Sequence, residues 1–162
     1  MEKKLSRKRT LTLVLIILIL VTIVFIWSNS LQSIPESQTK SIDFLNKVKP
    51  LLEIFVGTGN VTDHLVRKLA HFTEFGALGC ELALLLALRK RINWQSVINS
   101  AFFAMAVALT DETIQIFTGR GSQVQDVWLD FAGSCTGILF VLLIRLLITT
   151  PRRKHKPNHV SK

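Results

Sequence analysis

The chain has 162 residues, of which 49% are hydrophobic, and a formal net charge of +9 at neutral pH. Its apolar residues lie in long runs that a soluble domain could not bury on all sides, so the composition excludes an ordinary soluble protein. The basic residues gather beside these runs, which is typical of membrane orientation and contact with anionic lipid, and nucleic-acid binding is not expected.

The first predicted membrane span covers residues 11–27 and follows a basic N-terminus, residues 1–10. An aliphatic run of this length can cross the hydrocarbon core of about 30 Å. The same features fit a secretory signal peptide, because residues 28–30 loosely resemble a small-residue cleavage site. We favour a retained anchor, since the apolar run is longer than a usual signal core and the polar residues make a poor cleavage site.

A long polar segment follows the first span, and its character changes midway. Residues 28–41 are rich in Ser, Gln and Pro and are expected to be irregular. In residues 42–56, apolar side chains recur every three to four residues between charged ones. This spacing predicts an amphipathic segment on the membrane surface, interrupted or kinked at Pro50.

Three further spans are predicted at about residues 69–88, 95–117 and 127–149. The link at residues 89–91 and the tail at residues 150–162 are strongly basic, like the N-terminus, and all three lie on one side of a four-span arrangement. The positive-inside rule makes that side cytoplasmic, with both chain ends inside. The predicted fold is therefore an all-α, polytopic four-helix transmembrane bundle, with the amphipathic segment in its first extracytoplasmic loop.

Ionisable and polar residues gather at the extracytoplasmic end of the last three spans. Charged groups at or inside a bilayer are costly, so several that converge usually surround a wet cavity or a polar ligand. These residues are Arg67, Lys68, His71 and Glu74; Asp111, Glu112 and Gln115; Arg120; and Asp126 with Asp130.

Helix geometry predicts that these residues face the interior of the bundle. In the second span, His71, Glu74 and Glu81 share one face at 100 degrees per residue. In the third and fourth spans, the polar residues continue stripes of small residues, which mark close helix contacts in membranes. The stripes contain Ala101, Ala104, Ala108, Asp111 and Gln115 in the third span, and Asp126, Asp130, Gly133 and Gly137 in the fourth. We therefore expect one polar pocket, with the role of the deeper Glu81 left open.

Two interpretations compete for the charged residues. Arg67 and Lys68 have long stems and fit the description of anchors that extend to the membrane surface. Glu74, Asp111 and Glu112 are short acids inside apolar sequence and fit it less well. For these acids, structural ion pairing is weighed against a ligand-binding or catalytic role, and the second is favoured.

Residues 67–75 resemble the Arg-Lys-x-x-His-Phe-x-Glu-aromatic signature of the VanZ-like family of small bacterial membrane proteins. A second match covers residues 111–117 and continues through Gly119, Arg120, Asp126, Val127, Gly133 and Gly137. Two positions depart from the family pattern: Thr118 replaces a common Pro, and Phe75 replaces a frequent Tyr. Because residue 75 is Phe, a tyrosyl hydroxyl is not part of the site in this chain.

The resemblance implies a multi-pass protein of the bacterial cell membrane, in a Gram-positive organism, and a role in resistance to glycopeptides such as teicoplanin. The first functional hypothesis is a pocket that binds an envelope molecule, either a lipid-linked precursor or the lipid tail of a lipoglycopeptide. Basic side chains can hold phosphate or carboxylate, and membrane lipids are expected partners. The predicted ligand-binding residues are Arg67, Lys68, Gln115, Arg120, Asp126 and Asp130. The oligomeric state is left open.

The alternative hypothesis is a membrane enzyme acting on a lipid-linked envelope substrate. His71 would be a general base oriented by a carboxylate, and the catalytic candidates are His71, Glu74, Asp111 and Glu112. These four could also gather a divalent metal. The sequence has no nucleophile motif, phosphate-binding glycine loop or Cys/His zinc pattern, so we predict no metal and no cofactor. A small transporter ranks last, because the charge gathers at one rim instead of crossing the membrane.

Overall fold

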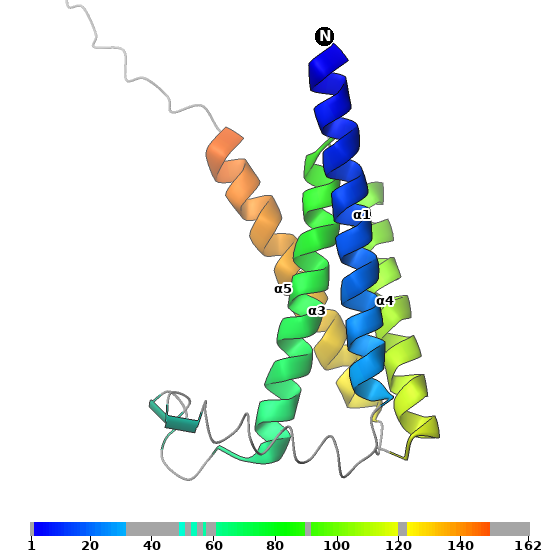
Figure 1. Cartoon of the computed structure of the whole chain (residues 1–162). Helices are drawn as coiled ribbons and strands as arrows, with labels where there is room; N and C mark the ends of the chain where they lie inside the picture. The colour runs from blue at the N-terminus through cyan, green and yellow to red at the C-terminus, as the bar shows by residue number, and fades with distance from the viewer. Residues whose placement is uncertain are drawn as a thin grey trace, which may run out of the picture.

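The computed structural model describes residues 2–31, 49–50, 53–54, 57, 61–89, 92–119 and 123–149. Four long helices run through these residues: α1 (Glu2–Ser30), α3 (Asp63–Ala87), α4 (Trp94–Phe117) and α5 (Val124–Thr149) (Figure 1). All four are long and apolar enough to cross a membrane. The predicted all-α, four-span bundle is confirmed.

Several sequence-based predictions fall on residues outside the described ranges. Arg120, the basic tail and most of the basic link at residues 89–91 are among them. Of the amphipathic segment at residues 42–56, only residues 49, 50, 53 and 54 are described. There, Lys49 Nζ lies 4.0 Å from Glu53 Oε1, one helical turn away.

All four helices begin before the predicted spans, most clearly α1 and α3, and a capping residue explains the start of α3. α3 begins at Asp63 instead of near residue 69, because the Thr62 side chain accepts a hydrogen bond from the Leu65 amide at 3.2 Å. Such an N-cap satisfies an amide that the helix itself leaves unpaired. α1 begins at Glu2 and includes the basic residues before the apolar run. Arg67 and Lys68 consequently lie on the first turns of α3 and not in a preceding loop.

The closest packing in the bundle joins α3 to α5 through small residues. A Cβ added at Gly79 would overlap the backbone of Ser134, and one added at Gly137 would overlap the backbone of Gly76. A Cβ added at Gly133 would likewise overlap the backbone of Phe72. Without a hydrophobic driving force between helices in lipid, this backbone approach is a principal source of attraction. The predicted packing role of Gly133 and Gly137 is confirmed.

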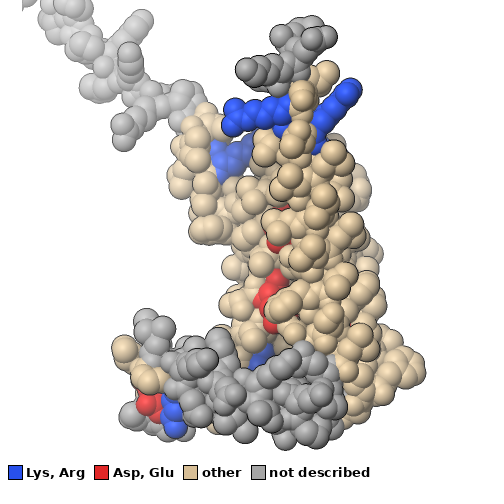
Figure 2. Space-filling view, viewed as in Figure 1, with Lys and Arg blue, Asp and Glu red and all other residues tan. Residues whose placement is uncertain are grey.

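α1 completes the bundle by packing against α3 and α4. Ile19, Ile23 and Ile26 of α1 are buried in the same core as Phe75 and Leu78 of α3. On the face that Figure 2 shows, the acidic atoms between the helices appear as small patches, and basic side chains gather near the start of α1. α1 is therefore a packed member of the bundle.

The two cysteines are packing residues, as their small-residue surroundings in the sequence suggest. Neither Cys80 nor Cys135 forms a disulfide. The Cys80 thiol lies 3.5 Å from the Gly137 carbonyl oxygen, at the close contact between α3 and α5.

We predict that Gly79→Ala and Gly137→Ala each lower the stability of the detergent-solubilised protein by about 1–3 kcal/mol, because the added methyl group forces two backbones apart. Gly76→Ala is the matched control, since a Cβ there meets its nearest atom, the Gly133 carbonyl oxygen, at 3.6 Å. Thermal unfolding followed by circular dichroism measures the difference. An equal loss of stability in all three variants would contradict the proposed helix contact.

Candidate functional site

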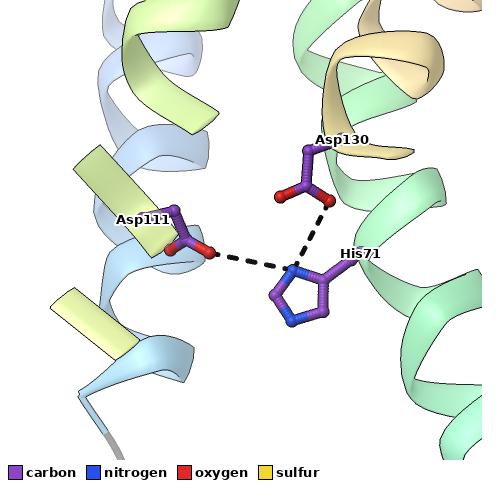
Figure 3. Close-up of side chains that lie close together, drawn as sticks. All are labelled: His71, Asp111 and Asp130. Atoms are coloured by element: carbon purple, nitrogen blue, oxygen red, sulfur yellow. Dashed lines mark ion pairs between the residues drawn. The ribbon is translucent and has the colours of Figure 1, made fainter. Parts of the chain in front are cut away.

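Three helices bring one ionisable side chain each to a common point near one end of the bundle. His71 comes from α3, Asp111 from α4 and Asp130 from α5 (Figure 3). The His71 Nδ1 atom lies 3.8 Å from Asp111 Oδ2 and 3.8 Å from Asp130 Oδ1. The side chain of His71 is 18% exposed, while those of Asp111 and Asp130 are 0% and 1% exposed. An imidazole between two buried carboxylates is the central feature of the site.

Gln115 links two acids of α4 on the same face of the site. Its Nε2 donates to Asp111 Oδ2 at 2.9 Å and to Glu112 Oε1 at 3.0 Å. All three side chains are buried. Because both amide protons go to carboxylates, Gln115 lessens the repulsion between two neighbouring acids and fixes their rotamers.

Glu74 is bonded to α1. The Asn29 side chain donates from Nδ2 to Glu74 Oε1 at 3.1 Å. Nearby, the Thr118 hydroxyl donates to the Ser30 carbonyl oxygen at 3.1 Å. The end of α1 is therefore attached to both α3 and α4 at the level of the site.

A cavity of about 140 Å³ lies at the same end and is lined mainly by polar side chains from α3, α4 and α5. Its lining comprises His64, Arg67, Lys68, His71, Glu112, Gln115, Gln123, Asp126, Leu129 and Asp130. The single expected pocket is thus present in the structure. The Lys68 ammonium is already paired, at 3.1 Å, with Asp126 Oδ1, which is in the first turn of α5.

The cavity has a basic and an acidic side. His64, Arg67 and Lys68 occupy the first turns of α3, where the positive end of the helix dipole adds to their charge. Glu112 and Asp130 lie on the acidic side with Gln115. Such an arrangement can hold a ligand that carries both an anionic group and a hydrogen-bond donor.

The predicted and observed sites agree in most members and differ in their pairings. The structure places Asp130, which we predicted only as a ligand-binding residue, beside His71, whereas the catalytic candidate Glu74 contacts Asn29. Arg120 is outside the described residues. Sequence reasoning missed Asn29, His64 and Gln123. Helical periodicity extended back to Thr62 would have placed His64 on the face of Lys68 and His71.

Glu81 lies away from this site and within the apolar core. It accepts a hydrogen bond at 2.8 Å from the Thr22 hydroxyl of α1. Its buried position and its partner on a neighbouring helix show that Glu81 joins α3 to α1.

We predict that Gln115→Ala lowers the free energy of unfolding by about 1–3 kcal/mol, because it removes the donor shared by two buried carboxylates. Gln95→Ala is the matched control: Gln95 also bonds to a residue four positions away on α4, donating to Asn99 Oδ1 at 2.8 Å, but on an exposed surface. That variant should change stability by less than about 0.5 kcal/mol. Similar melting temperatures for both variants in detergent would argue against the buried bridge.

Comparison with known proteins agrees with this architecture. No curated protein and no solved structure matches the chain. One family model, described as VanZ/LLP1, matches residues 12–145. The match extends from α1 into α5 and includes all of the described lining residues of the cavity. The chain belongs to the VanZ/LLP1 family.

Proposed function

We propose that this protein binds the anionic headgroup of an envelope lipid or lipid-linked molecule in its polar cavity, at the extracytoplasmic rim of the membrane. The observation that carries the proposal is the basic side of the cavity, where His64, Arg67 and Lys68 surround the N-terminal turns of α3. Phosphate and carboxylate groups are the ligands that such a side favours.

The size of the cavity supports a headgroup over a whole antibiotic. Sites for drug-sized molecules usually enclose about 300–1,000 Å³, whereas this cavity encloses about 140 Å³. A phosphate or a small polar group fits that volume, and a glycopeptide does not. The attached acyl chain would lie along the exposed apolar surface of the helices, which includes Ile116, Phe117 and Val124 near the same end.

The orientation completes this proposal. The starts of α3 and α5 and the end of α4 lie at one end of the bundle, opposite the start of α1 and the end of α5 (Figure 1). Lys3, Lys4, Arg7, Lys8 and Arg9 at the opposite end favour a cytoplasmic N-terminus. The cavity would then open on the extracytoplasmic side, and the protein would contribute to glycopeptide resistance by holding an envelope precursor or a lipoglycopeptide tail.

Cysteine labelling in intact cells tests the proposed orientation of the protein in the membrane. On a Cys80→Ser, Cys135→Ser background, Gln123→Cys should react with a membrane-impermeant maleimide, because residue 123 precedes α5 at the cavity end. Ser6→Cys, in the basic part of α1, should react only after the cells are permeabilised. The reverse labelling pattern would place the cavity on the cytoplasmic side.

We predict that purified protein retains an anionic lipid, and that Arg67→Ala raises the Kd for that lipid roughly tenfold, as expected for loss of a charge-assisted hydrogen bond worth about 1.4 kcal/mol. Native mass spectrometry after incubation with phosphatidylglycerol measures the occupancy. Arg9→Ala is the matched control, because Arg9 lies on α1 at the other end of the bundle. Equal occupancy in Arg67→Ala and wild type would overturn headgroup binding at this cavity.

A second candidate function, an enzyme acting on the bound lipid-linked molecule, is favoured by one observation. His71 Nδ1 is equidistant from two buried carboxylates, an arrangement that orients an imidazole for proton transfer. In this reading His71 exchanges a proton with the substrate, Asp111 and Asp130 orient the ring, and Glu112 adjusts Asp111 through Gln115. His71→Gln would then retain lipid but stop its turnover, whereas simple binding leaves the lipid unchanged in both proteins.

A further inference from the structure

We propose that His71, Asp111 and Asp130 form a binding site for a divalent transition-metal ion at the inner end of the polar cavity. This inference goes beyond headgroup binding, because an ion can occupy the site whether or not a lipid is present. It also departs from our sequence-based prediction of no metal, which considered Glu74 and Glu112 together with His71 and Asp111.

The first argument is the geometry of the donor atoms. One donor atom from each of the three side chains lies within 4.8 Å of the other two. Three atoms at these separations have a common centre no more than roughly 2.8 Å from each of them. Metal–oxygen distances in proteins are about 2.0–2.6 Å. Rotamer changes of less than one ångström would therefore complete the coordination.

The second argument is the state of Asp130. Its side chain is 1% exposed, and neither carboxylate oxygen accepts a hydrogen bond from any residue that the structure describes. The carboxyl group points toward His71 and Asp111 (Figure 3). A buried carboxylate normally receives hydrogen bonds or pairs with a charge, and a metal ion satisfies both needs.

The third argument is the local charge. Two buried carboxyl groups, those of Asp111 and Asp130, face the same imidazole, and Glu112 shares the Gln115 amide with Asp111. The Lys68 ammonium is bound to Asp126. A dication between Asp111 and Asp130 would offset the repulsion between their carboxylates where the surroundings are apolar.

The donor types decide the class of ion. One imidazole nitrogen with two carboxylate oxygens suits Zn²⁺ or Mn²⁺ better than Mg²⁺ or Ca²⁺, which prefer oxygen donors alone. Gln115 supports the set from outside, because its amide bonds to Asp111 Oδ2 at 2.9 Å and fixes that carboxylate. Three protein donors leave a further coordination position toward the cavity.

The experiment measures the metal content of the full-length protein. His155→Ala and His159→Ala in the tail, and an affinity tag without histidine, remove other imidazoles that could bind the ion. Purified protein is incubated with Zn²⁺ or Mn²⁺, passed through a desalting column and analysed by inductively coupled plasma mass spectrometry. We expect about one ion per chain, and Asp130→Asn should reduce the affinity at least tenfold. Glu81→Gln, which changes a carboxyl group of α3 away from the three donors, should bind like the parent protein.

Two results would overturn the proposal: folded parent protein that retains no stoichiometric ion, or an Asp130→Asn variant that retains as much as the parent. If Asp130→Asn does not fold, X-ray absorption of the Zn²⁺-loaded parent replaces it, and a ligand set without an imidazole would reject the site. None of these measurements uses lipid, so loss of lipid binding in Arg67→Ala and loss of metal in Asp130→Asn are separate outcomes.

Discussion

The close approach of α3 and α5 is the constraint on which the rest of the structure depends. The backbone of Gly79 meets that of Ser134, and Gly133 and Gly137 meet the backbone of α3 at Phe72 and Gly76. This contact fixes the relative height of the two helices. His71 immediately precedes Phe72, the residue against which Gly133 packs, and Asp130 is one turn before Gly133. The pairing of His71 with Asp130 is therefore a consequence of backbone packing and not of attraction between the side chains alone.

The bundle contains several buried or partly buried acids, and their hydrogen-bond donors come from α1 or from the acids' own helix. Asn29 of α1 donates to Glu74, Thr22 of α1 donates to Glu81, and Gln115 of α4 bonds two acids on its own helix. A polar group in an apolar region is costly unless it is hydrogen-bonded, so these contacts specify how the helices pack as well as how strongly. α1 is thus more than an anchor, since two of its polar side chains reach acids of α3.

Much of this organisation could be predicted from the sequence. Long apolar runs, helical phase and small-residue spacing predicted four spans, their contacting faces and one polar pocket. The pairings could not be predicted in the same way. Helical periodicity places Glu74 and His71 on one face of a helix. Whether Asn29 or Asp130 lies opposite each of these side chains depends on the heights at which three helices cross. The helix start at Asp63 was missed because hydropathy marks the apolar part of a helix, whereas the Thr62 cap marks its end.

The origin of Asp130 on the last helix has a consequence for biosynthesis. A chain is inserted into the membrane from its N-terminus, so α1, α3 and α4 enter the bilayer before α5 is complete. During that interval the carboxyl group of Asp111 and the imidazole of His71 lie in the membrane without their third neighbour, and the backbone face of Gly76 and Gly79 is uncovered. Insertion of α5 closes that face and the polar cluster in one step. A chain truncated before α5 would retain three membrane helices with this polar and small-residue face uncovered.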